Sequence, residues 1–98
     1  MTLLDDITGF QWDDGNIDKS QIKHLITPKE AEEIFLDEKL AIENDIKHSE
    51  LEKRCIAIGK TLDRKLLFCI FTVRNKYIRI ISVRRANKKE HALYEEAT

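Results

Sequence analysis

A set of cations in the C-terminal half of the chain carries the clearest chemical signal in the sequence. They lie in or beside segments of β-type composition, and they are Arg54, Lys60, Arg74, Arg79 and Arg84, with Lys88 and Lys89 after the last segment. Arg79 stands between Ile78 and Ile80, where a charge is costly unless that face is open or the charge is paired. Two interpretations stay open. The planar guanidinium of Arg79 binds a phosphate, or it lies on a half-exposed sheet face and pairs with a carboxylate such as Glu52.

Two histidines are the candidates for proton transfer. Imidazole donates or accepts a proton near neutral pH, which the cleavage of an RNA strand can use. The ordinary alternatives are a residue at a helix C-terminus for His24 and a loop residue for His48. Tyr94 follows Glu90 by four residues and shares its helix face, a spacing that also fits an aromatic side chain anchoring the helix to the core.

Other kinds of chemistry lack their motifs. The three glycines are scattered, so there is no glycine-rich phosphate loop, and no Cys or His pair has the spacing of metal ligands. Cys55 and Cys69 stand inside apolar runs, which argues against a disulfide scaffold and fits a reducing cytoplasm. No apolar run approaches the ~20 residues of a membrane span, and the N-terminus lacks the pattern of a secretory signal. We therefore expect a cytoplasmic protein with no metal, no cofactor and no membrane contact.

The 98 residues suffice for a single domain, in which charge is unevenly distributed along the chain. Residues 1–50 carry 5 Lys/Arg and 13 Asp/Glu, whereas residues 51–98 carry 12 Lys/Arg and 5 Asp/Glu. Such asymmetry hints at a polyanionic partner. The alternative is that folding interleaves the two halves and mixes their charges again.

The N-terminal half predicts one strand, two helices and a second short strand. Alternation at Phe10 and Trp12 predicts a strand that ends in the turn at 13–16, followed by a helix over 17–25. Thr27-Pro28-Lys29-Glu30 has the residues of a capping box and predicts a second helix that ends near Asp37. A short strand is expected over 40–42 and a loop over 45–50.

The C-terminal half predicts a three-strand meander and a helix. Strands are expected over 54–60, 66–73 and 77–84, with turns at 62–65 and 74–76 and a helix over 88–95 capped by Asn87. The middle strand is apolar on both faces, as a central strand requires. Strict alternation in the last strand predicts Tyr77, Arg79, Ile81 and Val83 on one face and Ile78, Ile80, Ser82 and Arg84 on the other. The whole pattern is α+β.

Ordered motifs over some 85 positions carry a resemblance to a known family. They are Phe10-x-Trp12-Asp13, Gly15-Asn16-x-x-Lys19, Lys23-His24, Glu30-Ala31-Glu32-Glu33-x-Phe35, Asp45-x-x-His48-Ser49, Glu52-x-Arg54, Gly59-Lys60-Thr61, Leu67-Phe68-x-x-Phe71-Thr72-x-Arg74, Ile78-Arg79-Ile80-Ile81-Ser82-x-Arg84 and Lys88-Lys89-Glu90-x-x-x-Tyr94-Glu95. On these residues the chain resembles the BrnT family, small ribonuclease toxins of bacterial type II toxin–antitoxin systems with a fold related to the RelE toxins. It departs from the family pattern at Ser20, Leu25 and Val83, where the family commonly has Asn, Gly and Ala, and near His91, where Arg is usual.

The resemblance implies a fold, an activity and a set of site residues. The fold is a small RelE-like domain with an N-terminal strand and two helices, an antiparallel sheet with a three-strand meander, and a C-terminal helix; residues 1–8 form a leader and 9–95 match the family. The activity is endonucleolytic RNA cleavage without a metal, which inhibits translation and growth and leaves a 2′,3′-cyclic phosphate. The implied catalytic residues are Arg79, Arg84, His24 and His48, and the implied RNA-binding residues are Lys19, Lys23, Arg54, Arg74 and Tyr94.

The resemblance also implies a protein partner. BrnT toxins are neutralised by the antitoxin BrnA, whose ribbon-helix-helix part binds DNA, so this chain would contact operator DNA only through its antitoxin. An alternative is a RelE-like domain that has lost its activity and persists as a partner or co-repressor of a DNA-binding protein. A metabolic enzyme is not favoured, because no cofactor motif is present.

Overall fold

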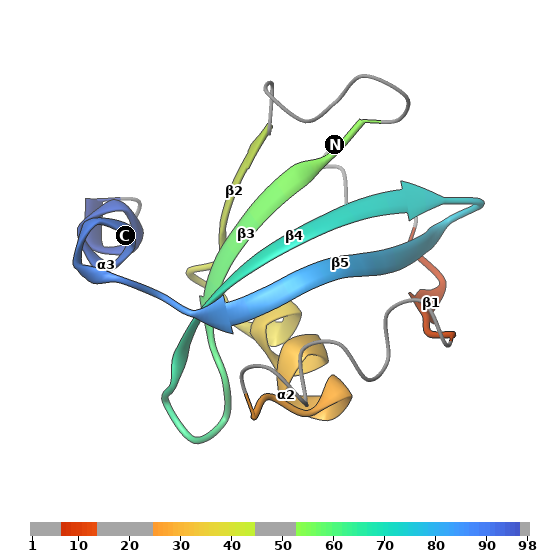
Figure 1. Ribbon diagram of the computed structural model, residues 1–98. Coiled ribbons are helices and arrows are strands. Elements are labelled where there is room, and N and C mark those ends of the chain that lie inside the picture. The colour runs from red at the N-terminus through yellow and green to blue at the C-terminus, as the bar shows by residue number, and fades with distance from the viewer. Residues whose placement is uncertain (1–6, 14–24, 45–52, 97–98) are drawn as a thin grey trace.

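One five-stranded sheet organises the molecule, with a helix on each of its faces (Figure 1). The computed structural model describes residues 7–13, 25–44 and 53–96. The strands are β1 (Gly9–Gln11), β2 (Ala41–Asn44), β3 (Cys55–Lys60), β4 (Leu66–Arg74) and β5 (Tyr77–Arg85), in the spatial order β1-β5-β4-β3-β2. Helix α2 (Pro28–Glu33) runs into a 3₁₀ turn, η1 (Ile34–Leu36), and α3 (Lys88–Glu96) follows β5. The predicted α+β class is confirmed.

Strand β4 lies at the centre of the sheet, as its apolar sequence predicts. It pairs antiparallel with β3 on one side and with β5 on the other, which confirms the expected meander. Its odd-numbered residues, such as Cys69 and Phe71, belong to the main core that also contains Ala31 and Ile34 of the helical segment. We call this the inner face. The even-numbered residues of β4, such as Phe68 and Thr72, define the outer face.

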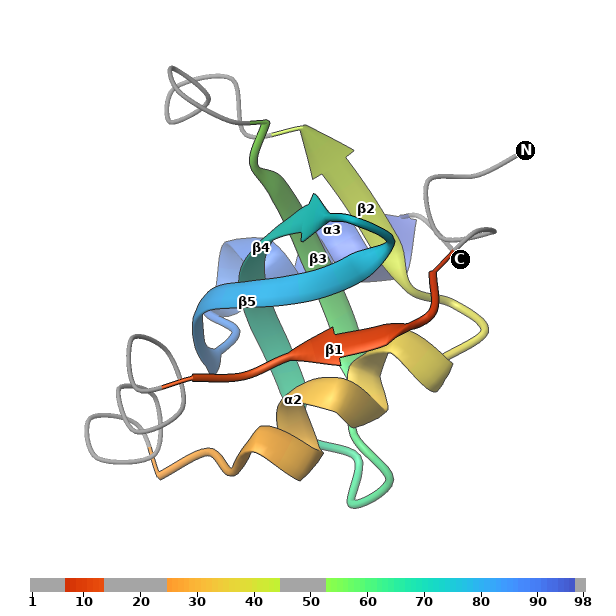
Figure 2. The same ribbon diagram turned by 90° about the vertical axis from the view of Figure 1, so that its right-hand side faces the viewer.

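The sheet is not antiparallel throughout, and this corrects the expected layout. Strand β1 pairs in parallel with β5, with Gly9 opposite Tyr77 and Gln11 opposite Arg79. Figure 2 shows β1 running beside β5 at the edge of the sheet. The partner of β1 comes more than sixty residues later, so local alternation reveals the strand but not its direction of pairing. The RelE-like layout is therefore matched only in part. Of the helix expected over 17–25, only Leu25 is described, and its φ of 57° is not helical.

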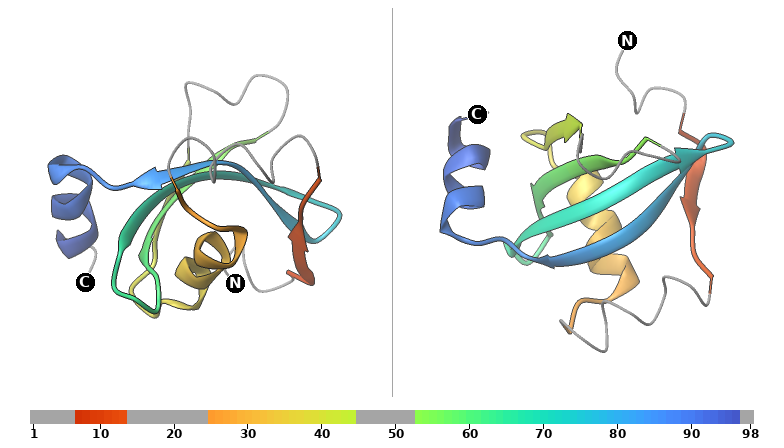
Figure 3. Two further views of the ribbon diagram at one scale, coloured as in Figure 1. Left: turned by 60° about the horizontal axis from the view of Figure 1, so that its bottom comes forward. Right: turned by 45° about the horizontal axis from the view of Figure 1, so that its top comes forward.

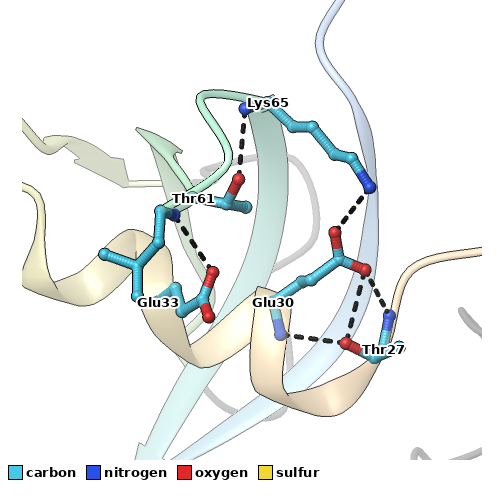
Figure 4. Close-up of polar contacts among 6 residues, drawn as sticks. Thr27, Glu30, Glu33, Thr61 and Lys65 are labelled. Atoms are coloured by element: carbon cyan, nitrogen blue, oxygen red, sulfur yellow. Dashed lines mark hydrogen bonds and ion pairs between the residues drawn. The ribbon is translucent and has the colours of Figure 1, made fainter.

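Helix α2 begins where the sequence predicts, because its first turn is closed by side chains. The Thr27 hydroxyl accepts a hydrogen bond from the Glu30 backbone N–H, and the Glu30 carboxylate accepts one from the Thr27 N–H, both at 3.1 Å. Glu30 also pairs with Lys65 Nζ at 2.7 Å, and these hydrogen bonds, that of Lys65 first, lower its pKa (Figure 4). The Leu62 N–H donates to Glu33 at 3.1 Å. Helix α2 is thus bonded to the turn between β3 and β4.

The inner face is packed tightly against the helical segment, around which the sheet curves (Figure 3, left). Phe35 makes edge-to-face contacts with Phe10 of β1 and Phe71 of β4, at centroid distances of 5.5 and 5.2 Å. At Gly59 of β3 a Cβ atom would stand 2.9 Å from the carbonyl oxygen of Ile34. The absence of a side chain there lets the helical segment approach the strand closely.

Helix α3 covers one end of the outer face. Its Tyr94 is buried with Ile58 and Leu66, and Phe68 packs against this cluster. The helix begins as predicted at Asn87, whose side chain accepts from the Glu90 N–H while the Glu90 carboxylate accepts from the Asn87 N–H, both at 2.9 Å. This reciprocal pair is a capping arrangement with Asn in the N-cap position.

Two expectations about composition can be compared with the fold. Cys55 and Cys69 are both free and buried, and burial raises the pKa of each thiol above its usual range.

The acidic and basic halves of the chain are brought together by ion pairs. Lys65 pairs with Glu30, and Arg79 pairs with Asp13. The interleaving of the two halves is therefore confirmed at these positions.

Candidate functional site

A β-bulge in β5 puts Arg79 and Arg84 on the same face of the sheet. Ile70 of β4 pairs with Ser82, but the next residue, Phe71, pairs with Ile80, so β5 has one residue more than β4 at this point. The extra residue reverses the alternation beyond it. The predicted separation of Arg79 and Arg84 onto opposite faces is therefore wrong. Both arginines project from the outer face, while Ile78, Ile80 and Val83 are all buried in the main core.

Arg79 is held by a carboxylate of the N-terminal segment. Its Nη1 donates to Asp13 Oδ2 at 2.6 Å, and its Nη2 donates to Asp13 Oδ1 at 3.0 Å. The Arg79 side chain is 16% exposed and that of Asp13 is 51% exposed. This is the paired arginine that the sequence left as one alternative, with Asp13 in place of the expected Glu52, which lies outside the described residues. A two-point contact of this kind fixes the plane of the guanidinium.

Three of the predicted cations occupy strand positions close to Thr72 on the outer face. Arg79 is the cross-strand partner of Thr72, and Arg74 stands two residues along β4 on the same face. Arg54 directly precedes β3, and its position is tied to β4 because the Thr72 hydroxyl donates to the Lys53 carbonyl oxygen at 2.8 Å. We call Arg54, Arg74 and Arg79 the arginine cluster. The sequence proposed all three, and the structure brings them to one part of one face.

Arg84 lies toward the other end of the outer face, beside α3. Its guanidinium donates to both carboxylate oxygens of Glu90, each at 2.7 Å, and stacks over the Phe68 ring with 4.2 Å to the centroid. Hydrogen bonding to Glu90 raises the pKa of Arg84. Arg84 pairs with Phe68 and Arg79 with Thr72, four residues along β4. At a strand rise of about 3.3 Å per residue, the two positions are about 13 Å apart. The two arginines therefore stand over different parts of the outer face.

Glu90 and Tyr94 both act in docking α3. Burial alone would raise the pKa of Glu90, but hydrogen bonds from Arg84 and from the Asn87 N–H outweigh it and lower that pKa. The Tyr94 hydroxyl donates to Asp37 Oδ2 at 2.6 Å, and the residue is 5% exposed. Burial, and then the Asp37 carboxylate, raise the pKa of Tyr94 to about 12. These contacts account for Tyr94 as a packing residue, and its role in RNA binding stays a prediction.

Four of the predicted site residues lie outside the described residues. They are Lys19, Lys23, His24 and His48, so the proposed phosphate contacts and acid–base roles of these residues stay predictions. Over residues 7–13, 25–44 and 53–96, no group of three His, Cys, Asp or Glu side chains could hold a metal ion. Within the same ranges no helix is long and apolar enough to cross a membrane.

Sequence reasoning missed the two carboxylates that hold the arginines. A signal for Asp13 was present: if Phe10 and Trp12 face the core, alternation directs Asp13 to the opposite side. Trp12 does face inward, and its Nε1 donates to Glu32 of α2 at 2.7 Å. For Glu90 the signal was the spacing Asn87-x-x-Glu90, which places its carboxylate at the start of the helix and close to the end of β5.

Comparison with known proteins bears directly on these residues. Residues 12–90 match the family model described as the ribonuclease toxin BrnT of type II toxin–antitoxin systems. A search of curated proteins finds no significant match. The matched range contains the whole arginine cluster, Arg84 and both carboxylates that hold arginines. Because the match spans well over half of the chain, the protein belongs to the BrnT family of ribonuclease toxins.

Proposed function

We propose that the outer face of the sheet binds and cleaves RNA without a metal ion, with the arginine cluster at the scissile phosphate and Arg84 on a second phosphate. The observation that carries this proposal is the convergence of Arg54, Arg74 and Arg79 around Thr72. Cleavage of an RNA strand passes through a phosphorus centre that carries more negative charge than the bound substrate. Cations already fixed in place stabilise that state more than the ground state.

The geometry supports distinct roles for Arg79 and Arg84 in this proposal. Arg79 is largely covered and is held in plane by Asp13, so its position is fixed before substrate arrives. Arg84 is 38% exposed at its side chain and is stacked on Phe68. With about 13 Å between the two positions along the strand, and each guanidinium held by its own carboxylate, the two arginines suit two different phosphates of one RNA strand. Arg84 therefore binds the strand away from the cleaved bond and sets its direction across the sheet.

The family also points to a protein partner. A type II toxin has an antitoxin, and we propose that it is of the BrnA type, with a ribbon-helix-helix part that binds operator DNA while this chain contacts DNA only through it. In this scheme the toxin acts in the cytoplasm and inhibits translation and growth when the antitoxin is lost. A short gene for a ribbon-helix-helix protein beside this one is the expected genomic neighbour. Co-expression of its product should restore growth.

The test of the catalytic proposal is cleavage of total RNA in the presence of EDTA. Wild-type protein should cut RNA, and Arg79→Ala should lose at least 100-fold in rate, because a removed transition-state contact typically costs 10²–10³. The matched control is Arg85→Ala, which removes the next arginine of β5, an exposed residue whose cross-strand partner, Leu67, lies on the inner face. Arg85→Ala should cleave at nearly the wild-type rate.

Two results would contradict the proposal. Equal activity of Arg79→Ala and Arg85→Ala would place the chemistry away from the arginine cluster. Absence of cleavage by folded wild-type protein that still binds its antitoxin would favour the alternative of an inactive RelE-like binding module. The paired state of Arg79 and Arg84 makes that alternative worth testing, because both guanidinium groups already have a carboxylate partner.

A further inference from the structure

We propose that the Asp13 carboxylate is the general base of the cleavage reaction, taking the proton from the attacking 2′-hydroxyl while Arg79 beside it holds the scissile phosphate. This inference rests on the proposed function of the outer face. It adds a catalytic residue that the cation-based interpretation of the sequence did not include. The starting observation is the two-point contact between Asp13 and Arg79, at 2.6 and 3.0 Å.

The relative exposure of the two partners suits this role. The Arg79 side chain is 16% exposed, whereas the Asp13 side chain is 51% exposed. A ligand on the outer face therefore reaches the carboxylate more readily than the buried part of the guanidinium. Glu90, which holds Arg84, is 10% exposed, and its oxygens also accept from the Asn87 N–H. Asp13 is therefore the more open to substrate of the carboxylates that hold Arg79 and Arg84.

The backbone that carries Asp13 is held in place by contacts with β5 and with α2. Gln11 pairs with Arg79 in the parallel ladder, and Trp12 is tied to Glu32 of α2 by a 2.7 Å hydrogen bond. A base must lie within hydrogen-bond reach of the proton it removes, so a fixed position is needed. Asp13 obtains that position from the two residues that directly precede it.

The chemistry balances with these groups and water. The 2′-hydroxyl proton passes to a carboxylate oxygen of Asp13, the 2′-oxygen forms a bond to phosphorus, and the bond from phosphorus to the 5′-oxygen breaks. The leaving 5′-oxygen takes a proton from water. The products are a 2′,3′-cyclic phosphate and a 5′-hydroxyl, and the proton on Asp13 returns to solvent.

Substrate binding itself strengthens the base. A carboxylate paired with a guanidinium holds protons weakly, and an anion brought close to it increases its affinity for a proton. When an RNA phosphate binds at Arg79, it shares the guanidinium with Asp13 and adds a negative charge beside it. Among the described residues, the charged or titratable neighbours that share this region of the outer face are Arg54, Arg74, Tyr77 and Arg79. Arginine and tyrosine do not ordinarily titrate between pH 5 and 9, whereas His24 and His48, the other candidates for proton transfer, do. A pH-dependent rate in that range is therefore assigned to the carboxylate by its loss in Asp13→Asn and not by its pH range alone.

The test is the pH profile of single-turnover cleavage of an RNA oligonucleotide between pH 5 and 9. Wild-type protein should show a rate that rises with pH and then levels. Asp13→Asn should cleave at least 100-fold more slowly, as the loss of a general base predicts, and its profile should lack the rising limb. Asp13→Glu should keep the limb at a reduced rate. Asp63→Asn, at an exposed turn residue, is the matched control and should behave as wild type.

The outcomes separate a base from a residue that only positions Arg79. A slower Asp13→Asn that keeps the wild-type pH profile would overturn the inference and show a positioning role, and equal rates would overturn it outright. Failure of wild-type protein to cleave RNA at all would overturn the proposed function together with this inference. Asn has nearly the shape of Asp and its Oδ1 can still accept a hydrogen bond from Arg79, so Asp13→Asn is expected to fold. If it does not fold, Asp13→Glu provides the test. A Glu side chain that acts as the base keeps the rise of the cleavage rate with pH, whereas an inactive Asp13→Glu contradicts the proposal.

Discussion

Replacing Tyr94 by Phe tests how α3 is held on the sheet. The change removes one hydroxyl and keeps the ring in the cluster with Ile58 and Leu66. The lost interaction is the 2.6 Å hydrogen bond to Asp37, which also accepts from the N–H groups of Lys39 and Lys60. A hydrogen bond to a charged group contributes about 1.5–3 kcal/mol, and the lower value applies because Asp37 keeps two donors. For a chain of this length, a loss of about 1.5 kcal/mol lowers Tm by roughly 6–12 °C.

The pH dependence of the same variant provides an independent check. Burial and the Asp37 carboxylate raise the pKa of Tyr94 from 10.0 to about 12 in the folded protein. A raised pKa means that the folded state favours the neutral phenol. The contribution is therefore fully present below pH 10 and is lost as the pH rises toward 12. Its upper size is about 2–3 kcal/mol, from 1.36 kcal/mol per unit. The Tm difference between wild type and Tyr94→Phe should shrink over that range.

The assay is thermal unfolding followed by circular dichroism at pH 7 and at steps from pH 9 to 12. Tyr77→Phe serves as the control, because Tyr77 is 41% exposed on β5 and should change Tm little. A Tm difference below about 2 °C for Tyr94→Phe at pH 7 would refute the reasoning. RNA cleavage at 20 °C distinguishes the two roles of Tyr94. Wild-type activity in Tyr94→Phe agrees with a packing role of the ring. A Tyr94→Phe protein that is folded but inactive would show that the hydroxyl takes part in binding or cleaving RNA.

Three further predictions concern stability. Leu25→Gly should stabilise the fold by about 1 kcal/mol, measured by urea unfolding, because Leu25 has a φ of 57° and is 82% exposed; destabilisation would contradict this. Gly59→Ala should cost about 1–3 kcal/mol because its Cβ would meet backbone at 2.9 Å, while Gly9→Ala, with 3.5 Å to its nearest neighbour, should be nearly neutral in the same assay. Glu90→Gln should lower Tm at pH 7, and the difference in Tm from wild type should shrink as the pH falls below about 4. The reason is that the pKa of Glu90 is lowered in the folded protein, so its contribution to the free energy of unfolding exists only while the carboxylate is ionised. A difference that is constant from pH 7 to pH 3 would show that the charge of the pair with Arg84 is unimportant.

The elements set by local signals could be predicted from the sequence. The capping residues of α2 and α3, the central strand β4 and the hairpin at Asn75 and Lys76 all lie where local chemistry requires them. In the hairpin both turn residues have positive φ, at 50° and 69°, as a two-residue turn of this type demands. Signals of this kind involve a few consecutive residues, so they can be recognised from the sequence without knowledge of the fold.

The features set by distant pairing could not be predicted. The parallel contact of β1 with β5 depends on two segments at opposite ends of the chain, and the bulge in β5 depends on register with β4 rather than on its own sequence. Strict alternation therefore assigned Arg79 and Arg84 to opposite faces. For the candidate site, the sequence identified Arg54, Arg74 and Arg79 by type, but Asp13 as the carboxylate partner of Arg79 became evident only through the fold.

The Asp13–Arg79 pair also has a consequence for the timing of synthesis. Its partners are 66 positions apart, so neither residue can meet the other until the ribosome has passed both positions. At about 5–20 residues per second, a ribosome needs roughly 3–13 s to pass from one to the other. Edge strand β1 cannot form its parallel pairing until β5 has left the ribosome. A nascent chain therefore lacks this arginine–carboxylate pair during that interval, and the outer face gains its fixed arginine only after β5 has been made.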